Sequence, residues 1–381
     1  MELALYVHIP FCLRKCLYCD FASFADAPVP PAAYVAALVR EMELRAARLA
    51  RPVTAATLYL GGGTPSLLAP ELVAGVVAAA RRQFSLSDAA EVTLEANPGT
   101  LTVETLAGFR AAGVNRLSLG VQSFDDRLLA GLGRIHTARE AEAAVHRART
   151  AGFSNLGLDL IHGLPGQDPA GWERDLRRAT ALAPEHISAY ALAVEEGTPF
   201  HRLAATGELA LPPEEEAVRM FEQTSEVLTA CGYEHYEIAN FARPGYRSRH
   251  NQVYWQRGPY LGFGAAAHSF LPTPGWGIRW RNPADPAAYR VALDRGGLPA
   301  GEVTPLSRQE AMGEWFFLGL RLREGVDLAA FPQEFGLTVA EAFPGVLDRL
   351  AGQGLVEVAE DRLRLTPKGL LLANQVFLAF L

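Results

Sequence analysis

Short apolar runs alternate with longer helical patterns through the first half of the chain. The runs lie at 3–9, 57–62, 91–97, 116–122, 155–161 and 186–192. Between them, segments such as 32–50 and 138–151 are rich in Ala, Arg and Glu and carry apolar residues at helical spacing. The pattern predicts six β–α units and a parallel sheet, because each crossover must return the chain to the same edge.

Each predicted strand ends in polar residues, glycine or proline. The six ends read HIPFC, GGGTP, EANPG, GVQSF, DLIHGLPGQ and ALAVEEGTP. In parallel α/β folds, chemistry gathers at the carboxyl ends of the strands, where loops vary without disturbing the core. All six ends therefore point to one site.

The pattern changes twice after the sixth strand. From about 234 it becomes aromatic and rich in Gly and Pro, which predicts strands and loops added to the sheet edge. From about 305 helical spacing returns, followed by the hairpin-like sequence LVEVAEDRLRLTPKG and a final apolar helix. We expect a core at 1–233, an edge elaboration at 234–304 and a helical, winged-helix-like C-terminal domain at 305–381. Acidic residues outnumber basic ones in that domain, which favours packing or a lid over DNA binding.

Composition narrows the classes of function. The chain has 381 residues, 49% of them hydrophobic, enough for one large core and a smaller one. A formal net charge of -7 and the lack of a basic stripe argue against a nucleic-acid partner. The start LALYVHIPF lacks a basic leader and a cleavage site, and no apolar run reaches membrane-spanning length. We expect a cytoplasmic protein.

Three of the four cysteines stand together as CxxxCxxC: Cys12, Cys16 and Cys19. So few cysteines make no disulfide framework, and such a group more often holds metal in a reducing compartment. Three thiolates can bind one face of a cubane iron–sulfur cluster and leave its fourth iron open. Zinc is the competing metal, but a closed zinc site needs a fourth ligand, for which His8 and Cys231 are the alternatives. Otherwise we expect Cys231 to be a buried core thiol.

Several motifs at the strand ends resemble one family. YVHIPFCLRKCLYCDF, GGGTP, EANP, GVQS and GLPGQ occur in the order typical of radical S-adenosylmethionine (SAM) proteins. They are most similar to the branch that contains oxygen-independent coproporphyrinogen III dehydrogenase and haem chaperones of the HemW type. The resemblance covers nearly the whole chain. It implies a partial six-stranded (β/α) barrel and a 4Fe-4S cluster on the three clustered cysteines, whose open iron is chelated by SAM.

The resemblance also implies which residues contact SAM. Glycines 61–63 let the backbone approach the methionyl amine closely, and amide, carboxylate and guanidinium groups suit the ribose and the carboxylate. A turn, a structural hydrogen bond or a core aromatic is the alternative role at these positions. The residues are Tyr6, Tyr18, Gly62, Gly63, Thr64, Glu95, Gln122, Arg134 and Asp159.

Two departures separate the members of the branch. The dehydrogenases carry a further cysteine where this chain has Phe21, and they have an N-terminal extension where this chain starts almost directly with its first strand. Both differences favour the chaperone.

The sequence RHNQVYW at 249–255 matches the HNxxYW motif of HemW-type proteins, as does the upstream YEIANFARPG. We expect His250 to be an axial ligand or attachment point for haem, because an imidazole suits iron. Beside Asn251, the rings of Tyr254 and Trp255 offer a flat apolar surface for the macrocycle. Three arginines could pair with its propionates: Arg247, Arg249 and Arg257. A satisfied histidine among core aromatics is the alternative.

The resemblance therefore implies a haem chaperone that passes haem to acceptor haemoproteins. A reducing electron donor such as a flavodoxin or ferredoxin, a homodimer and a transient membrane-associated acceptor are the further expected partners. The first alternative is coproporphyrinogen III dehydrogenase, which decarboxylates the propionates oxidatively through a deoxyadenosyl radical. The second is a radical enzyme on an unrelated substrate, for which HNQVYW would be structural.

Overall fold

Six parallel strands form the centre of the main sheet and follow one another in chain order. The computed structural model describes residues 2–49, 52–299 and 301–381. The apolar runs of the sequence predicted all six strands correctly. They are β1 (Glu2–Ile9), β2 (Thr54–Gly62), β3 (Glu91–Ala96), β4 (Arg116–Gln122), β5 (Leu156–His162) and β6 (His186–Ala191).

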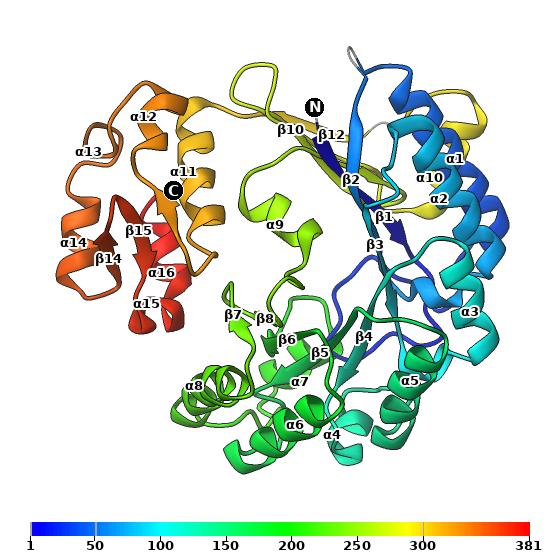
Figure 1. Cartoon of the computed structure of the whole chain (residues 1–381), viewed down its shortest axis with the longest axis horizontal. Coiled ribbons are helices and arrows are strands. Elements are labelled where there is room, and N and C mark those ends of the chain that lie inside the picture. Colours follow the sequence, from blue (N-terminus) through cyan, green and yellow to red (C-terminus); the bar gives the residue numbers. More distant parts are fainter. Residues whose placement is uncertain (1, 50–51, 300) are drawn as a thin grey trace.

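Helices cover the outer face of these strands and form an arc around them (Figure 1). Short 3-10 turns at Pro65–Leu67 and Pro98–Thr100 follow β2 and β3. The predicted segment 32–50 is helical up to Ala46, and its residue 50 lies outside the described residues. The helices are α1 (Pro31–Ala46), α2 (Pro70–Phe84), α3 (Val103–Ala111), α4 (Asp126–Gly131), α5 (Ala138–Thr150), α6 (Pro169–Ala181), α7 (Pro199–Ala205) and α8 (Glu214–Ala230).

Added strands extend the sheet at both edges. Beyond β6 lies β8 (Asn240–Ala242), antiparallel to β6, and then β7 (Glu234–His235), antiparallel to β8. Beyond β1 lie β9 (Tyr260–Phe263), parallel to β1, and then the antiparallel β10 (His268–Leu271), β11 (Ile278–Arg281) and β12 (Glu302–Pro305). The order of the twelve strands among the described residues therefore leaves the barrel open, because β1 and β6 each pair with an added strand.

Two helices interrupt the added strands. Helix α10 (Pro286–Asp294) packs on α1, while α9 (Arg249–Trp255) packs on β1 and β2. Figure 1 shows α9 inside the arc of strands, on the side away from the outer helices. The sequence pattern predicted strands and loops here, so the expectation was wrong for 249–255 and for 286–294. Ser248 caps the helix by accepting a hydrogen bond from the backbone of Asn251.

The C-terminal part has its own apolar core, which runs from Ala311 to Phe380, whereas the first core runs from Leu3 to Leu293. The predicted hairpin is β14–β15. The predicted final helix is instead two short ones, because the chain turns at Leu372. The domain boundaries stay a prediction. The elements are α11 (Arg308–Gly319), β13 (Val326–Asp327), α12 (Ala330–Phe335), α13 (Val339–Ala342), α14 (Val346–Gly352), β14 (Val356–Ala359), β15 (Arg362–Leu365), α15 (Pro367–Leu371) and α16 (Ala373–Leu378).

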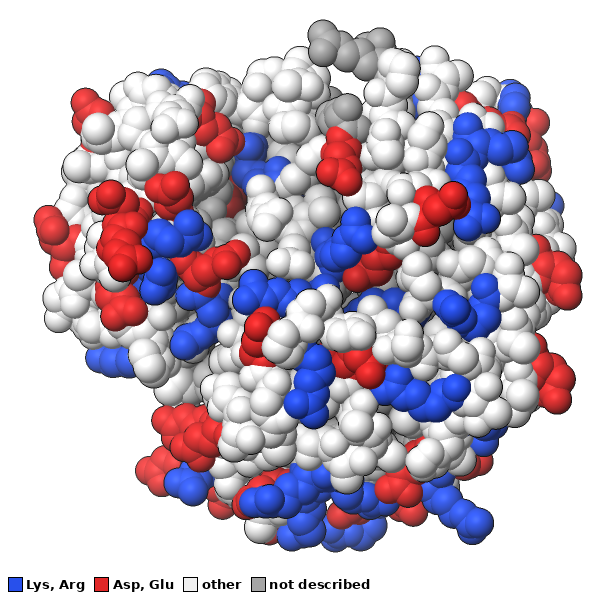
Figure 2. Space-filling model, viewed as in Figure 1, with Lys and Arg blue, Asp and Glu red and all other residues white. Residues whose placement is uncertain are grey.

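The surface offers no simple partner signal. On the face in Figure 2, basic and acidic side chains are interspersed. Among the helices of the described residues, none combines the length and the apolar character needed to cross a membrane.

A buried carboxylate joins α1 to the added strands. The side chain of Glu41 is fully buried and lies 2.9 Å from the guanidinium of Arg45. It also accepts hydrogen bonds from the Asn282 amide, the Tyr289 hydroxyl and the Gly264 backbone, at 2.9, 2.7 and 3.0 Å. These donors come from beyond β9, so one side chain fixes the added edge against the core.

We predict that Glu41→Ala lowers the free energy of unfolding by about 3 kcal/mol, because the buried Tyr289 hydroxyl and the Gly264 amide lose their acceptor and Arg45 loses its ion-pair partner. Glu43→Ala on the same helix is the control. Glu43 pairs with Arg40 at the surface, so its loss should cost less than about 1 kcal/mol. Urea denaturation measures both, and equal losses would contradict a special role for Glu41.

Candidate functional site

The loop after β1 carries the three clustered cysteines. It closes on itself, since the Cys12 backbone donates to Phe24 and the Phe24 backbone donates to Pro10, at 3.0 and 2.8 Å. The Leu17 backbone in turn donates to Leu132 before the turn that leads into α5. Cys12, Cys16 and Cys19 are free thiols of intermediate exposure. The loop therefore holds the thiols at the strand ends, as predicted.

A cavity of about 380 Å³, which we call the cysteine cavity, lies beneath this loop. It brings together residues from the ends of all six parallel strands, as the motif pattern predicted. Of the predicted residues, those lining it are Cys12, Cys16, Tyr18, Cys19, Gly62, Gly63, Thr64, Glu95, Gln122, Arg134, Asp159 and Asn251.

Zinc and an iron–sulfur cluster are the two alternatives for the three thiols. Among the described residues, no three Cys, His, Asp or Glu side chains converge on one metal-ion position. A zinc ion needs all its donors to meet at one point, whereas the thiolates of an iron–sulfur cluster bind different irons. The alternatives proposed for a fourth zinc ligand fit poorly. The His8 Nε2 donates to the Ala22 carbonyl and its Nδ1 is hydrogen-bonded to the Tyr6 hydroxyl. Cys231 is exposed at the end of α8, so its predicted burial was wrong.

Polar groups surround the thiols. The Arg134 guanidinium donates to the Cys16 sulfur at 3.4 Å and to the Gly120 carbonyl at 2.6 Å. The Thr64 hydroxyl lies 3.6 Å from the Cys12 sulfur. Burial raises the pKa of the Cys19 thiol, while the Lys15 charge opposes that shift. Cations beside the cysteines favour the thiolate form that binds iron.

The glycine run allows β2 to pass close under the loop. A Cβ at Gly62 would lie 2.5 Å from the His8 ring, and one at Gly63 would lie 2.6 Å from the Phe11 carbonyl oxygen. The amide of Gly62 donates to Glu95, that of Gly63 to Ile9 and that of Thr64 to Phe11. An amine ligand is a hydrogen-bond donor, so carbonyl or side-chain oxygens would hold it here.

Two buried carboxylates face the cavity. Burial raises the pKa of Glu95 to about 7, although the Tyr59 hydroxyl opposes this by donating to Glu95 at 2.8 Å. Burial also raises the pKa of Asp159, which accepts from the Ser118 hydroxyl at 3.0 Å. Such groups gain from a cation brought into the cavity.

The sequence reasoning missed a buried charged residue of the cavity. Arg116 starts β4 and is only 2% exposed, and it lines the cysteine cavity near the two carboxylates. Its charge lowers the pKa of Asp159, opposing the effect of burial. In the sequence, an arginine as the first residue of an otherwise apolar strand could have indicated this buried charge.

Gln122 stands at the end of β4 in a strained backbone conformation. Its φ of 68° is left-handed, which residues other than glycine rarely adopt, and the pairing of β4 with β5 shifts register at this point. Gln122 lines the cysteine cavity at the point where the register shifts.

The HNxxYW motif lies on α9 with its histidine turned inward. His250 is 1% exposed, and its Nδ1 lies 2.8 Å from the Thr57 hydroxyl and its Nε2 2.7 Å from the Tyr254 hydroxyl. Burial lowers its pKa to about 3, so the ring is neutral. The Glu91 carboxylate accepts from the backbone amides of Arg249 and His250, both at 3.1 Å. A bond from haem iron to one ring nitrogen of His250 would require the side-chain hydrogen bond at that nitrogen to break.

A second cavity, of about 690 Å³, lies beside the cysteine cavity and shares Asp20, Phe21, Gly62 and Glu95 with it. We call it the hairpin cavity, because β10 and β11 form one wall. Tyr254 and Trp255 of the motif line it, and so does Tyr6, which was expected near SAM and does not line the cysteine cavity. His250 lines neither cavity. Its remaining walls are rich in aromatic and basic side chains: Tyr260, His268, Phe270, Arg257, Arg279 and Arg281.

Comparison with known proteins agrees with this geometry. The sequence model of the Radical SAM superfamily matches residues 6–179, and that of the HemN C-terminal domain matches residues 306–372. The protein named heme chaperone HemW of Bacillus subtilis is 39% identical over 99% of this chain and 98% of its own length. Its namesake in Mycobacterium tuberculosis H37Rv is 40% identical over 97% and 93% of the two chains, respectively.

This chain belongs to the HemW family. The corresponding HemW of Escherichia coli K12 is 36% identical over all of this chain. Among solved structures, coproporphyrinogen III oxidase (HemN) from E. coli, described as a radical SAM enzyme, superposes with a TM-score of 0.84 at 27% identity, over 100% of this chain and 90% of that one. Membership in the superfamily implies a 4Fe-4S cluster and SAM for HemW proteins. The thiols, the nearby cations and the buried carboxylates of the cysteine cavity fit both groups.

We predict that Cys16→Ala abolishes cluster assembly, because an incomplete set of thiolates no longer holds the cubane. After anaerobic reconstitution, bound iron, bound sulfide and the visible absorbance should all be lost, while far-ultraviolet circular dichroism stays unchanged. Cys231→Ala is the matched control, since this thiol is exposed and far along the chain. Full iron and sulfide content in Cys16→Ala would rule out this cysteine as a ligand.

Proposed function

We propose that this protein is a haem chaperone, which binds haem and transfers it to acceptor haemoproteins. The observation that carries the proposal is the full-length similarity to proteins named heme chaperone HemW, at 39% identity over 98% of the B. subtilis protein. The hairpin cavity supports it, because its volume of about 690 Å³ suits a ligand of haem size and its walls are aromatic and basic.

The cysteine cavity is the proposed site of the resident cofactors. We assign the cluster to Cys12, Cys16 and Cys19. We assign SAM to Tyr6, which lines the hairpin cavity, and to the predicted SAM residues that line the cysteine cavity. The latter are Tyr18, Gly62, Gly63, Thr64, Glu95, Gln122, Arg134 and Asp159. When bound, the pair supplies one-electron chemistry at the sulfonium. The chain itself provides oxygen ligands for the amine at the glycine run, buried negative charge at Glu95 and Asp159, and a guanidinium at Arg134.

The motif residues have different proposed roles toward haem. Tyr254 and Trp255 line the hairpin cavity and can pack against the macrocycle, and Arg257 lines it as well. Asn251 faces the cysteine cavity. Ligation or attachment of haem at His250 remains a prediction and requires α9 to release this side chain.

Partners follow from the proposed role. We propose acceptor haemoproteins, including one at a membrane, and a reducing donor such as a flavodoxin or ferredoxin. We also propose dimerisation as one route of regulation, and action in the cytoplasm.

A second candidate function is coproporphyrinogen III dehydrogenase. The superposition on E. coli HemN favours it, with a TM-score of 0.84. Phe21 weighs against it, because the dehydrogenases have a cysteine at this position. Its side chain is 58% exposed and lies where the two cavities meet.

We predict that the reconstituted protein binds haem stoichiometrically and passes it to an apo-haemoprotein. Coproporphyrinogen III, SAM and reductant should give no protoporphyrinogen. Absorbance titration measures the haem, and chromatography measures the porphyrins. Turnover of coproporphyrinogen would make the protein the dehydrogenase, and absence of any haem binding would refute the chaperone.

We predict that SAM binds more tightly as the pH rises. The pKa of Glu95 is about 7 in the folded protein, so the carboxyl is largely protonated at about pH 6 and largely ionised at about pH 7.5. SAM is cationic, so its affinity should rise by up to about tenfold over this interval. Glu95→Gln should flatten the dependence. Equilibrium binding under anaerobic conditions measures both proteins, and an unchanged slope in Glu95→Gln would exclude this carboxyl.

A further inference from the structure

The β10–β11 hairpin turns one face toward the hairpin cavity. In its antiparallel register His268 lies opposite Arg281, and Phe270 lies opposite Arg279. Residues directly opposite one another share a face, so these four side chains stand together, and all four line the cavity. The other face carries Ser269 and Trp280 and packs toward the core.

His268 differs from the other histidine of this cavity. The ring nitrogens of His8 are both used, toward Ala22 and Tyr6. His268 is exposed, and within the described residues its ring makes no hydrogen bond. Partial burial and the charges of Arg281 and Arg279 lower its pKa, which keeps the imidazole in the neutral form that binds iron.

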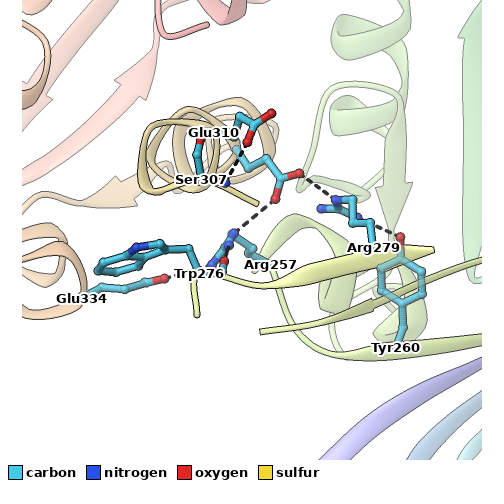
Figure 3. A network of polar contacts seen from close by, with 8 residues as sticks. Arg257, Tyr260, Trp276, Arg279, Ser307, Glu310 and Glu334 are labelled. Carbon is cyan, nitrogen blue, oxygen red and sulfur yellow. Dashed lines mark hydrogen bonds and ion pairs between the residues drawn. The ribbon is translucent and has the colours of Figure 1, made fainter. Parts of the chain in front are cut away.

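The three arginines of the cavity are not equally free. Arg257 and Arg279 both donate to the Glu314 carboxylate of α11, at 3.3 and 2.6 Å. Figure 3 shows these two guanidinium groups directed toward α11, with Arg279 also bonded to Tyr260. Arg281 is half-exposed, and its carboxylate partner Glu302 lies 3.6 Å away at the surface. Arg281 is therefore the guanidinium that can turn to a ligand.

Aromatic rings complete a site for a flat molecule. Phe270 is held between Arg257 and Arg279, whose guanidinium carbons lie 5.0 and 4.5 Å from its ring centre. The Tyr260 ring lies 4.6 Å from that of Tyr254, edge to face. The cavity thus combines aromatic side chains with an imidazole that makes no hydrogen bond among the described residues and a guanidinium whose one ion pair lies at the surface.

We propose that haem binds in the hairpin cavity with His268 as an iron ligand and Arg281 paired with a propionate. This inference rests on the proposed function. It places the iron porphyrin beside the cysteine cavity, since the two cavities share residues from the loop after β1 and from the ends of β2 and β3. It also assigns iron binding to a residue outside the HNxxYW motif.

The test compares haem with metal-free protoporphyrin IX, which has the same propionates but no iron. On reconstituted protein, His268→Ala should weaken haem binding by about tenfold or more and leave metal-free protoporphyrin within about twofold. Added imidazole should restore haem binding to His268→Ala and its axial-ligand signature in resonance Raman spectra. Arg281→Gln should weaken both porphyrins. His146→Ala is the control, since His146 is exposed on α5.

The outcomes are distinguishable. Haem binding that survives His268→Ala with an unchanged spectrum overturns the inference and leaves the chaperone function standing, and loss in His250→Ala alone would then assign the ligand to the motif. Equal loss of both porphyrins in His268→Ala means that this residue only shapes the cavity, which also overturns it. No haem binding by the unmodified protein refutes the proposed function itself.

Discussion

The site depends on parallel pairing between buried strands. Because β1 to β6 pair in parallel, their carboxyl ends must all lie on the same side of the sheet, and the loops that follow these ends converge there. The pairing of Ile9 with Gly62 then brings the cysteine loop directly over the end of β2. Only glycines fit beneath it, since a Cβ at Gly63 would lie 2.6 Å from a backbone oxygen. The position of the thiols is thus fixed by backbone packing.

The same convergence buries charge. Glu95 and Asp159 line a cavity that also contains the guanidinium of Arg116. Glu95 accepts a hydrogen bond from the Tyr59 hydroxyl, and Asp159 accepts one from the Ser118 hydroxyl. Buried charges are costly without partners, so this set is arranged to gain from a bound cation. A ligand with a positive sulfonium and an amine fits that requirement.

The hairpin cavity is formed by parts of the chain that are far apart in sequence. The hairpin cavity takes one wall from β10 and β11 and another from α9, and Leu318 of α11 also lines it. The Glu314 carboxylate ties the C-terminal part to two arginines of that wall, so movement of this part would free positive charge in the cavity.

Local pattern determined a large part of this protein. The six strands, the converging strand ends, the cysteine group and the C-terminal hairpin follow from short-range spacing, because apolar runs and turn residues act within a few positions. Helix α9 escaped because its seven residues are held by tertiary partners, with Glu91 at its start and Thr57 on its histidine. The exposure of Cys231 likewise depended on where α8 ends. His268 lies in an undistinguished AAAHSF sequence, and only the register of β10 with β11 sets it opposite Arg281. Residues brought together by strand register leave no signal within a local stretch of sequence, so that part of the site was decided by the tertiary structure.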